Sequence, residues 1–173
     1  MRRTLFALPI AIMASPASAA LPVGASAPEI VSTGALAGRP YKLDLNRELR
    51  KGPVVLYFFP KAGTQGCNAE AAMFSKNIRK FRKAGAHVIG MSADGYDALK
   101  PFSMKECSRA FPVATATPAT QKAYDVVNAS YPGLTTRTSY VIARNGKIVM
   151  VHDDPDHSQH VPLTLAAVQA LKK

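Results

Sequence analysis

The fold is decided by the stretch Val54-Val55-Leu56-Tyr57-Phe58-Phe59-Pro60-Lys61-Ala62-Gly63-Thr64-Gln65-Gly66-Cys67. Its first six residues are a continuous apolar and aromatic run, which predicts a strand that is buried on both faces and ends at Pro60. A loop with two glycines, residues 61–66, follows. Cys67 then stands where a buried strand has ended and a helix begins, and α/β sheets favour this edge for their reaction sites.

The best helix signal in the chain runs from Cys67 to Arg82. Apolar side chains recur there at steps of three and four residues, and nothing in the interval breaks a helix. The helix also carries a cluster of cations that we call the cationic face, which we expect to be a solvated surface that is able to attract acidic surfaces or steer anions. Its members are Lys76, Arg79, Lys80, Arg82 and Lys83.

Strands and helices alternate along the rest of the chain. Asn145-Gly146 is a strong signal for a two-residue hairpin turn between two strands. We expect Pro101 to lie in the first turn of its helix or to bend it. The expected elements are a strand at 87–91, a helix at 96–109, an extended run at 112–115, a helix at 119–127, strands at 139–143 and 147–151, and a helix at 163–171. This order predicts an α/β, thioredoxin-like fold with a mixed central sheet and helices on both faces.

The N-terminus has the pattern of a signal peptide. Arg2 and Arg3 precede a short apolar stretch, and Ala17-Ser18-Ala19 is a small-residue cleavage site. The apolar stretch is too short to span a bilayer. We therefore expect residues 1–19 to be cleaved and residues 20–173 to form a single domain. The protein is expected to be exported, to the periplasm if its source is a Gram-negative bacterium and otherwise to the medium.

The chain has 173 residues and a formal net charge of +11, and it stays strongly basic without its two N-terminal arginines. Because we expect export, we do not expect a nucleic-acid partner. No segment after residue 19 is apolar enough to predict stable membrane association. Cys67 and Cys107 are the only cysteines, so one intramolecular disulfide is possible, and an exported compartment would permit it.

The position of Cys67 favours a reactive thiol. In the first turn of a helix, the unpaired backbone N–H groups and the helix dipole stabilise a thiolate. Thr64 lies three residues earlier, where its hydroxyl is able to point at the sulfur or at an incoming substrate, or to cap the helix. Pro60 is able to wall off one side of the site without adding a donor. A lone cysteine without this setting would be interpreted as a small buried hydrophobe.

The spacing of Pro60, Thr64 and Cys67 resembles the Pro-x-x-x-Thr-x-x-Cys motif of the peroxiredoxins. The residues around it resemble the bacterioferritin-comigratory-protein branch, which is also called peroxiredoxin Q. The likeness extends over most of the chain after residue 19, where residues 23–28 resemble the entry strand of the family. It implies a thioredoxin-like fold and an enzyme that needs no cofactor and no metal.

The resemblance also assigns two charged residues. Residues 137–142 resemble the strand that carries the active-site arginine of the family, which places Arg137 beside Cys67. A permanent cation there would stabilise the thiolate and the charge that develops on the peroxide oxygens. Glu70, one helical turn after Cys67, matches the carboxylate that holds this arginine. Without the resemblance, Glu70 would be an ordinary acid in the first turn of a helix.

The implied activity is that of a thiol-dependent peroxidase. The Cys67 thiolate would attack hydrogen peroxide or an organic hydroperoxide and become a sulfenic acid, which a second thiol must resolve. Many members carry that second cysteine where this chain has Ala72, so Cys107 is the internal candidate and an external thiol the alternative. The expected partners are a peroxide and a thioredoxin-like or small-thiol reductant, and the expected state is a monomer or weak dimer.

Two other interpretations stay open at this stage. A thiol-disulfide oxidoreductase would need a Cys-x-x-Cys pair, but Asn68, Ala69 and Glu70 follow Cys67. An exported binding module would use Cys67 and Cys107 as a permanent disulfide, with a metal held by the histidines and aspartates after the hairpin. The spacing of these residues fits no known metal motif, and we expect a solvated loop there. They are His152, Asp153, Asp154, Asp156, His157 and His160.

Overall fold

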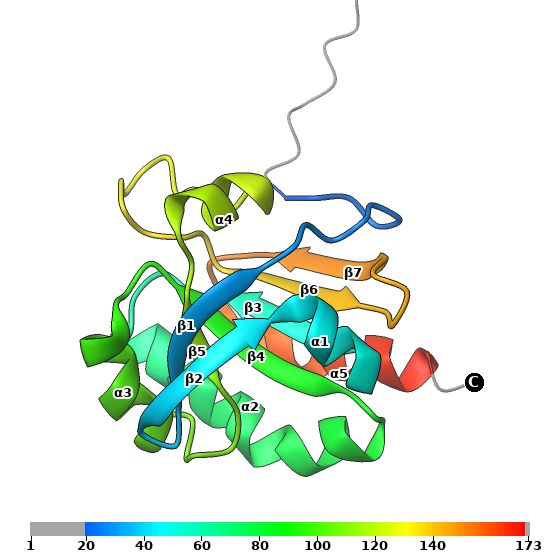
Figure 1. Ribbon diagram of the computed structural model, residues 1–173, viewed down its shortest axis with the longest axis horizontal. Helices are drawn as coiled ribbons and strands as arrows, with labels where there is room; N and C mark the ends of the chain where they lie inside the picture. Colours follow the sequence, from blue (N-terminus) through cyan, green and yellow to red (C-terminus); the bar gives the residue numbers. More distant parts are fainter. Residues whose placement is uncertain (1–19, 172–173) are drawn as a thin grey trace, which may run out of the picture.

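A seven-stranded mixed sheet, in the order β2-β1-β5-β4-β3-β6-β7, forms the centre of the computed structural model (Figure 1). The structure describes residues 20–171, so the expected signal peptide at residues 1–19 lies outside the described residues. The strands are β1 (Val31–Leu36), β2 (Arg39–Asp44), β3 (Val54–Phe58), β4 (His87–Ser92), β5 (Val113–Thr115), β6 (Thr138–Ile142) and β7 (Ile148–Asp153). The helices are α1 (Leu45–Lys51), α2 (Gln65–Lys83), α3 (Tyr96–Met104), α4 (Pro118–Ala123) and α5 (His160–Ala170), with a 3-10 turn at His157–Gln159.

The predicted doubly buried strand is β3, near the middle of the sheet. It pairs in parallel with β4 and antiparallel with β6, and all five of its residues are buried. Val55 and Tyr57 point into one core cluster, whereas Leu56 and Phe58 point into the other. This burial on both faces explains why the sequence there is continuously apolar.

Helices cover both faces of the sheet, as the sequence predicts. The core cluster on one face packs against α2, α3 and α5, and α2 and α5 lie side by side (Figure 1). The cluster on the other face includes Leu45 and Leu49 of α1 and Tyr124, which follows α4. None of the helices in residues 20–171 is long and apolar enough to cross a membrane.

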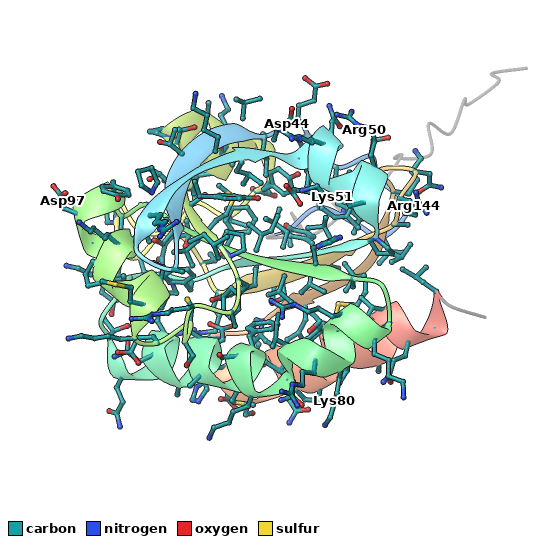
Figure 2. The ribbon with its side chains drawn as sticks, turned by 60° about the horizontal axis from the view of Figure 1, so that its bottom comes forward. Asp44, Arg50, Lys51, Lys80, Asp97 and Arg144 are labelled. Atoms are coloured by element: carbon teal, nitrogen blue, oxygen red, sulfur yellow. The ribbon has the colours of Figure 1, made fainter. Side chains whose placement is uncertain are left out.

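The predicted hairpin forms between β6 and β7, but its turn is not the expected two-residue Asn145-Gly146 turn. The N–H of Gly146 donates to the carbonyl of Ala143, so Arg144 and Asn145 are at the centre of the turn and Gly146 follows them with a φ of 78°. Arg144, in its turn, donates a hydrogen bond of 2.9 Å to the carbonyl of Arg50 at the end of α1, and Figure 2 shows these two residues near each other. The entry strand expected at residues 23–28 is wrong, because only Ser26 forms a bridge, with Lys147. Gly24 turns the chain with a φ of 91°, so the segment follows the hairpin without becoming a strand.

Three helix boundaries differ from the prediction by three residues or more. The helix expected to reach residue 109 ends at Met104, and Ser108 and Arg109 adopt left-handed backbone conformations with φ of 47° and 60°. Pro101 lies inside this helix and not in its first turn. The helix expected at 119–127 ends at Ala123, and the terminal helix begins three residues earlier than expected. Cys107 is therefore in a turn after α3, and the whole segment of β1, β2 and α1 was not predicted.

Candidate active site

Cys67 lies in the first turn of α2, where the chain has just left β3. It is 1% exposed, and the helix begins two residues before it. Thr64 is the N-cap residue by its extended backbone, and its carbonyl accepts the first helical hydrogen bond, from the N–H of Asn68. The N–H groups of the first turn are thus free of helical partners, and the positive end of the helix dipole favours a thiolate there.

Arg137 reaches the sulfur from the neighbouring strand. It directly precedes β6, whose first residue, Thr138, is paired with Phe58 at the end of β3. Its Nη2 group donates a hydrogen bond of 3.5 Å to the Sγ atom of Cys67. Its Nη1 group donates to Oε2 of Glu70, and its Nε group donates to the carbonyl of Pro155 at 2.9 Å. Three acceptors in different directions therefore fix the guanidinium group against the sulfur.

Glu70 lies one helical turn after Cys67 and is fully buried. Its Oε2 atom accepts the hydrogen bond from Arg137, whereas its Oε1 atom has no hydrogen-bond partner among the described residues. Burial raises the pKa of this carboxyl group to about 7, and the nearby charge of Arg137 opposes that rise. Glu70 is thus placed to hold the guanidinium group and, near neutral pH, to take up a proton.

Thr64 and Pro60 border the site. The hydroxyl of Thr64 is exposed and donates to the carbonyl of Lys61 at 2.9 Å, and within residues 20–171 it bonds neither to Cys67 nor to the helix as a cap. Its oxygen lone pairs stay open to a donor from outside. The loop between Pro60 and Thr64 is held by Asp94, whose Oδ2 atom accepts a hydrogen bond of 2.7 Å from the N–H of Ala62. Sequence reasoning missed Asp94, because an aspartate after a strand is no signal by itself.

A pocket of about 480 Å³ opens beside Arg137. Pro60, Tyr131, Leu134 and Pro155 give it mostly apolar walls, and its polar lining residues are Asn128, Thr136, Arg137 and Asp153. Tyr131 is 66% exposed at the rim. The pocket therefore suits a molecule with a polar, reacting end and an apolar remainder.

The structure does not join Cys107 to Cys67, since both cysteines are free and buried. Both side chains belong to the same core cluster. The carbonyl of Cys107 accepts a hydrogen bond of 3.1 Å from Ser75 of α2, which ties the turn after α3 to that helix. Burial raises the pKa of the Cys107 thiol well above its usual range, so this cysteine is not a thiolate while it is buried in the core.

The histidines and aspartates after the hairpin do not form one solvated loop, which corrects the sequence prediction. His160 is fully buried at the first residue of α5, and His152 and Asp153 belong to β7. Its spacing of four residues from Thr164 and of eight from Val168, both buried, was a signal for a helical face that sequence reasoning missed. Within residues 20–171, no group of three or more histidine, cysteine, aspartate or glutamate side chains is arranged to hold a metal ion.

Comparison with known proteins identifies the family. The model of the AhpC/TSA family matches residues 23–151. Chloroplastic peroxiredoxin Q from Sedum lineare is 32% identical over 136 residues, which cover 78% of this chain and 72% of the relative. The corresponding protein from Suaeda salsa is 33% identical over 69% of this chain, but the match spans only 56% of that relative.

Solved structures agree with this result. Peroxidoxin BcpB from Mycobacterium tuberculosis superimposes with a TM-score of 0.77 and 25% identity, covering 87% of this chain and 98% of that one. The bacterioferritin comigratory protein of Xanthomonas campestris gives a TM-score of 0.72 with 27% identity, covering 83% and 92%. The chain belongs to the AhpC/TSA family and is a peroxiredoxin that has peroxiredoxin Q and bacterioferritin comigratory proteins among its relatives.

Proposed function

We propose that the protein is a thiol-dependent peroxidase in which the Sγ atom of Cys67 is the nucleophile. The observation that carries the proposal is the hydrogen bond of 3.5 Å from Arg137 to this sulfur, at the N-terminus of a helix. A permanent cation and a helix dipole on one sulfur stabilise the thiolate, which is the reactive form of cysteine. The family to which the chain belongs supports the same activity.

The proposed reaction is a displacement at oxygen. The thiolate attacks the terminal peroxide oxygen, so that an S–O bond forms as the O–O bond breaks and Cys67 becomes a sulfenic acid. The leaving oxygen departs as hydroxide or alkoxide and takes up a proton. Negative charge moves from sulfur to this oxygen, and Arg137 is the cation close enough to stabilise it during the transfer. Pro60 shapes the pocket, and Thr64 offers the peroxide a hydrogen-bond acceptor at its edge.

We propose that organic hydroperoxides are substrates alongside hydrogen peroxide. The support is the pocket beside Arg137, whose walls of Pro60, Tyr131, Leu134 and Pro155 suit an alkyl group more than water. The Xanthomonas campestris relative is described as having alkyl peroxide reduction activity. Arg137 lines the same pocket, so a substrate with its alkyl tail on these side chains would lie beside this residue.

We further propose that Cys107 resolves the sulfenic acid by forming a disulfide with Cys67. Both sulfurs are buried, so the turn that carries Cys107 must open before bonding geometry is reached. Ser108 and Arg109 follow Cys107 directly, and both have left-handed backbone conformations. For a residue other than glycine, this conformation costs about 1 kcal/mol. This strain lowers the cost of opening the turn. A thioredoxin-like protein or a small thiol would then reduce the disulfide.

The other two interpretations are weaker. The residues after Cys67 supply no second cysteine within a helical turn, which a thiol-disulfide oxidoreductase needs. A binding module stapled by a permanent disulfide does not match a structure whose two cysteines are free.

Export is part of the proposal, because residues 1–19 have the pattern of a signal peptide. The mature chain would begin at Ala20, and we propose that it is a monomer or weak dimer. N-terminal sequencing of the protein recovered from the periplasm or medium tests the cleavage, and size-exclusion chromatography with light scattering tests the oligomeric state. Recovery of the chain from the cytoplasm with Met1 intact would contradict export.

The activity is tested by a matched pair of variants. Cys67→Ser should abolish peroxide consumption, whereas Cys107→Ser, an equally small change at an equally buried thiol, should leave the first turnover with peroxide intact. Peroxide loss is followed with an excess of a small thiol as the reductant. Retained turnover in Cys67→Ser would show that another group carries the reaction.

A further inference from the structure

The two carboxylate oxygens of Glu70 face different groups. Oε2 accepts the hydrogen bond from Arg137, whereas Oε1 is buried without a hydrogen-bond partner among the described residues. A basic ring nitrogen, Nδ1 of His160, lies 3.7 Å from Oε1. A buried carboxylate oxygen without a donor is costly, so this position calls for an explanation.

The ring of His160 is held in one tautomer. Its Nε2 atom lies 2.9 Å from the carbonyl of Asp154, and because a carbonyl only accepts hydrogen bonds, Nε2 carries the hydrogen. Nδ1 of the neutral ring therefore has a lone pair, to which the hydroxyl of Ser139 donates at 2.8 Å. The face that His160 turns toward Glu70 is thus an acceptor and not a donor.

Ionisation of Cys67 alone, with Glu70 still ionised, would change the charge of this buried cluster. With a thiol at Cys67, the charge of Arg137 is balanced by an ionised Glu70. A thiolate adds a second anion next to the same cation, in a cluster whose three members are at most 9% exposed. An excess buried charge is strongly unfavourable, and a proton on Glu70 removes it.

We propose that His160 is a positioning residue for the thiolate: it accepts the hydrogen bond of a protonated Glu70 and so leaves the charge of Arg137 to Cys67. The inference rests on the proposed role of Cys67 as a thiolate nucleophile. In the balanced step, the S–H bond of Cys67 breaks and an O–H bond forms at Oε1 of Glu70. That hydrogen then points at Nδ1 of His160, while Ser139 releases the lone pair and Arg137 keeps its bond to Oε2.

The electrostatics of the pair agree with this placement of the proton. Burial raises the pKa of Glu70 to about 7 and lowers the pKa of His160 to about 4, so the carboxyl group and not the ring holds the proton near neutral pH. Titratable groups on every neighbouring element interact with the pair. They are Cys67 on α2, Arg137 before β6, Tyr57 on β3, His152 on β7, and Asp154 and Asp156 after β7.

The test compares the pH midpoint of Cys67 ionisation in four forms of the full mature chain: unchanged, His160→Leu, Glu70→Gln, and both substitutions together. The midpoint is read from the ultraviolet absorbance of the thiolate and from the rate of alkylation at Cys67, without any peroxide. Loss of the acceptor in His160→Leu should raise the midpoint by about one pH unit, the size of one buried hydrogen bond. Glu70→Gln leaves no carboxyl group to protonate at this position, so in that background His160→Leu should leave the pH midpoint of Cys67 ionisation unchanged.

A purely structural role predicts a different pattern. If His160→Leu acts by loosening the loop of Asp154 and Pro155 around Arg137, the midpoint will rise equally in both backgrounds, and the proposal is overturned. No rise in either background overturns it as well. His160→Gln is the conservative control, because its amide keeps a donor for Asp154 and an acceptor for Glu70, so its midpoint should stay near that of the unchanged protein.

Nitrogen-15 NMR of the unchanged protein gives a readout that does not depend on the folding of any variant. The Nδ1 resonance of His160 should move with the ionisation of Cys67, and the Nε2 atom should keep its hydrogen throughout. An Nδ1 resonance that ignores this ionisation would overturn the proposal. Because no peroxide is present, these results are separate from a failure of the peroxidase activity, which the Cys67→Ser and Cys107→Ser pair tests.

Discussion

Arg137→Ala is expected to separate the catalytic contribution of the guanidinium group from its structural contribution. The substitution removes the donor that lies 3.5 Å from the sulfur and that, in the proposed reaction, stabilises the oxygen on which charge develops. Loss of one such donor typically lowers the rate by about 10²- to 10³-fold. We therefore expect the second-order rate constant of the reduced protein with hydrogen peroxide to fall by that factor.

The same substitution leaves Glu70 buried without its cation. Removing one partner of a buried ion pair costs about 3 to 5 kcal/mol, and protonation of Glu70 limits the cost to about the lower value. A matched variant isolates this effect: Arg137→Ala with Glu70→Gln removes the stranded carboxylate, so it should recover much of the free energy of unfolding. It should not recover the rate, because the donor to the sulfur is still absent.

The chain has no tryptophan, so the peroxide step is best followed by competition with a haem peroxidase for limiting hydrogen peroxide. Urea denaturation gives the free energy of unfolding of both variants. A rate within a few-fold of the unchanged protein in Arg137→Ala would contradict the role given to this residue. Recovery of the rate in the double variant would show that Arg137 acts only by neutralising Glu70.

Further expectations concern the second cysteine, the pocket and the pH dependence of stability. Cys107→Ser should leave the peroxide step unchanged but let Cys67 accumulate as sulfenic or sulfinic acid, which mass spectrometry detects. Tyr131→Ala should slow the reaction with a bulky organic hydroperoxide more than the reaction with hydrogen peroxide. An equal loss of rate for both substrates would contradict the role of the pocket in binding the organic group. The pKa of His160 is lowered from 6.5 to about 4, so the unfolded chain binds more protons in that window and stability falls there as the pH falls; His160→Gln should remove this loss in urea denaturation at several pH values. The pKa of Glu70 is raised from 4.5 to about 7, so in that pH range the folded chain binds more protons and this residue makes stability rise as the pH falls. Glu70→Gln should remove this gain, and the stability of the variant should fall more steeply with falling pH.

The central part of the fold was predictable because burial alone determines where apolar residues occur in its sequence. In β3 every side chain is buried, so the sequence is apolar without interruption, and in α2 the buried side recurs at helical spacing. The cationic face of α2 is exposed at all five positions, and Figure 2 shows Lys80 pointing outward from the helix. Asn145-Gly146 likewise indicated the last hairpin, although the turn itself is centred on Arg144 and Asn145.

The first hairpin and α1 escaped prediction for a physical reason. β2 is an edge strand of the sheet and β1 lies next to it, and in both strands only some residues are buried and the alternation of apolar and polar residues is weak. In the turn between them, Ala37 has a φ of 52°. Alanine rarely adopts this conformation, so the sequence does not predict a turn there. A left-handed residue of this kind is set by the strands on either side of it.

The site divides in the same way. Cys67 was predictable from its position and from a family motif, whereas the roles of Arg137 and Glu70 came from the resemblance to the family. The structure shows these three side chains in one hydrogen-bonded cluster. The carbonyl of Pro155 carries no side-chain signal, so its hydrogen bond with Arg137 was invisible in the sequence. His160 was assigned to a loop because the helical pattern was followed only from residue 163, three residues after α5 begins.

The most direct test of the account is peptide mass mapping of the reduced mature protein after one equivalent of hydrogen peroxide, with free thiols blocked immediately. We predict oxidation at Cys67, seen as a Cys67 to Cys107 disulfide. Cys67 sulfenic or sulfinic acid beside a free Cys107 would keep the peroxidase and replace the internal resolving step with an external thiol. Two unmodified cysteines would contradict the claim that Cys67 is a peroxidatic nucleophile.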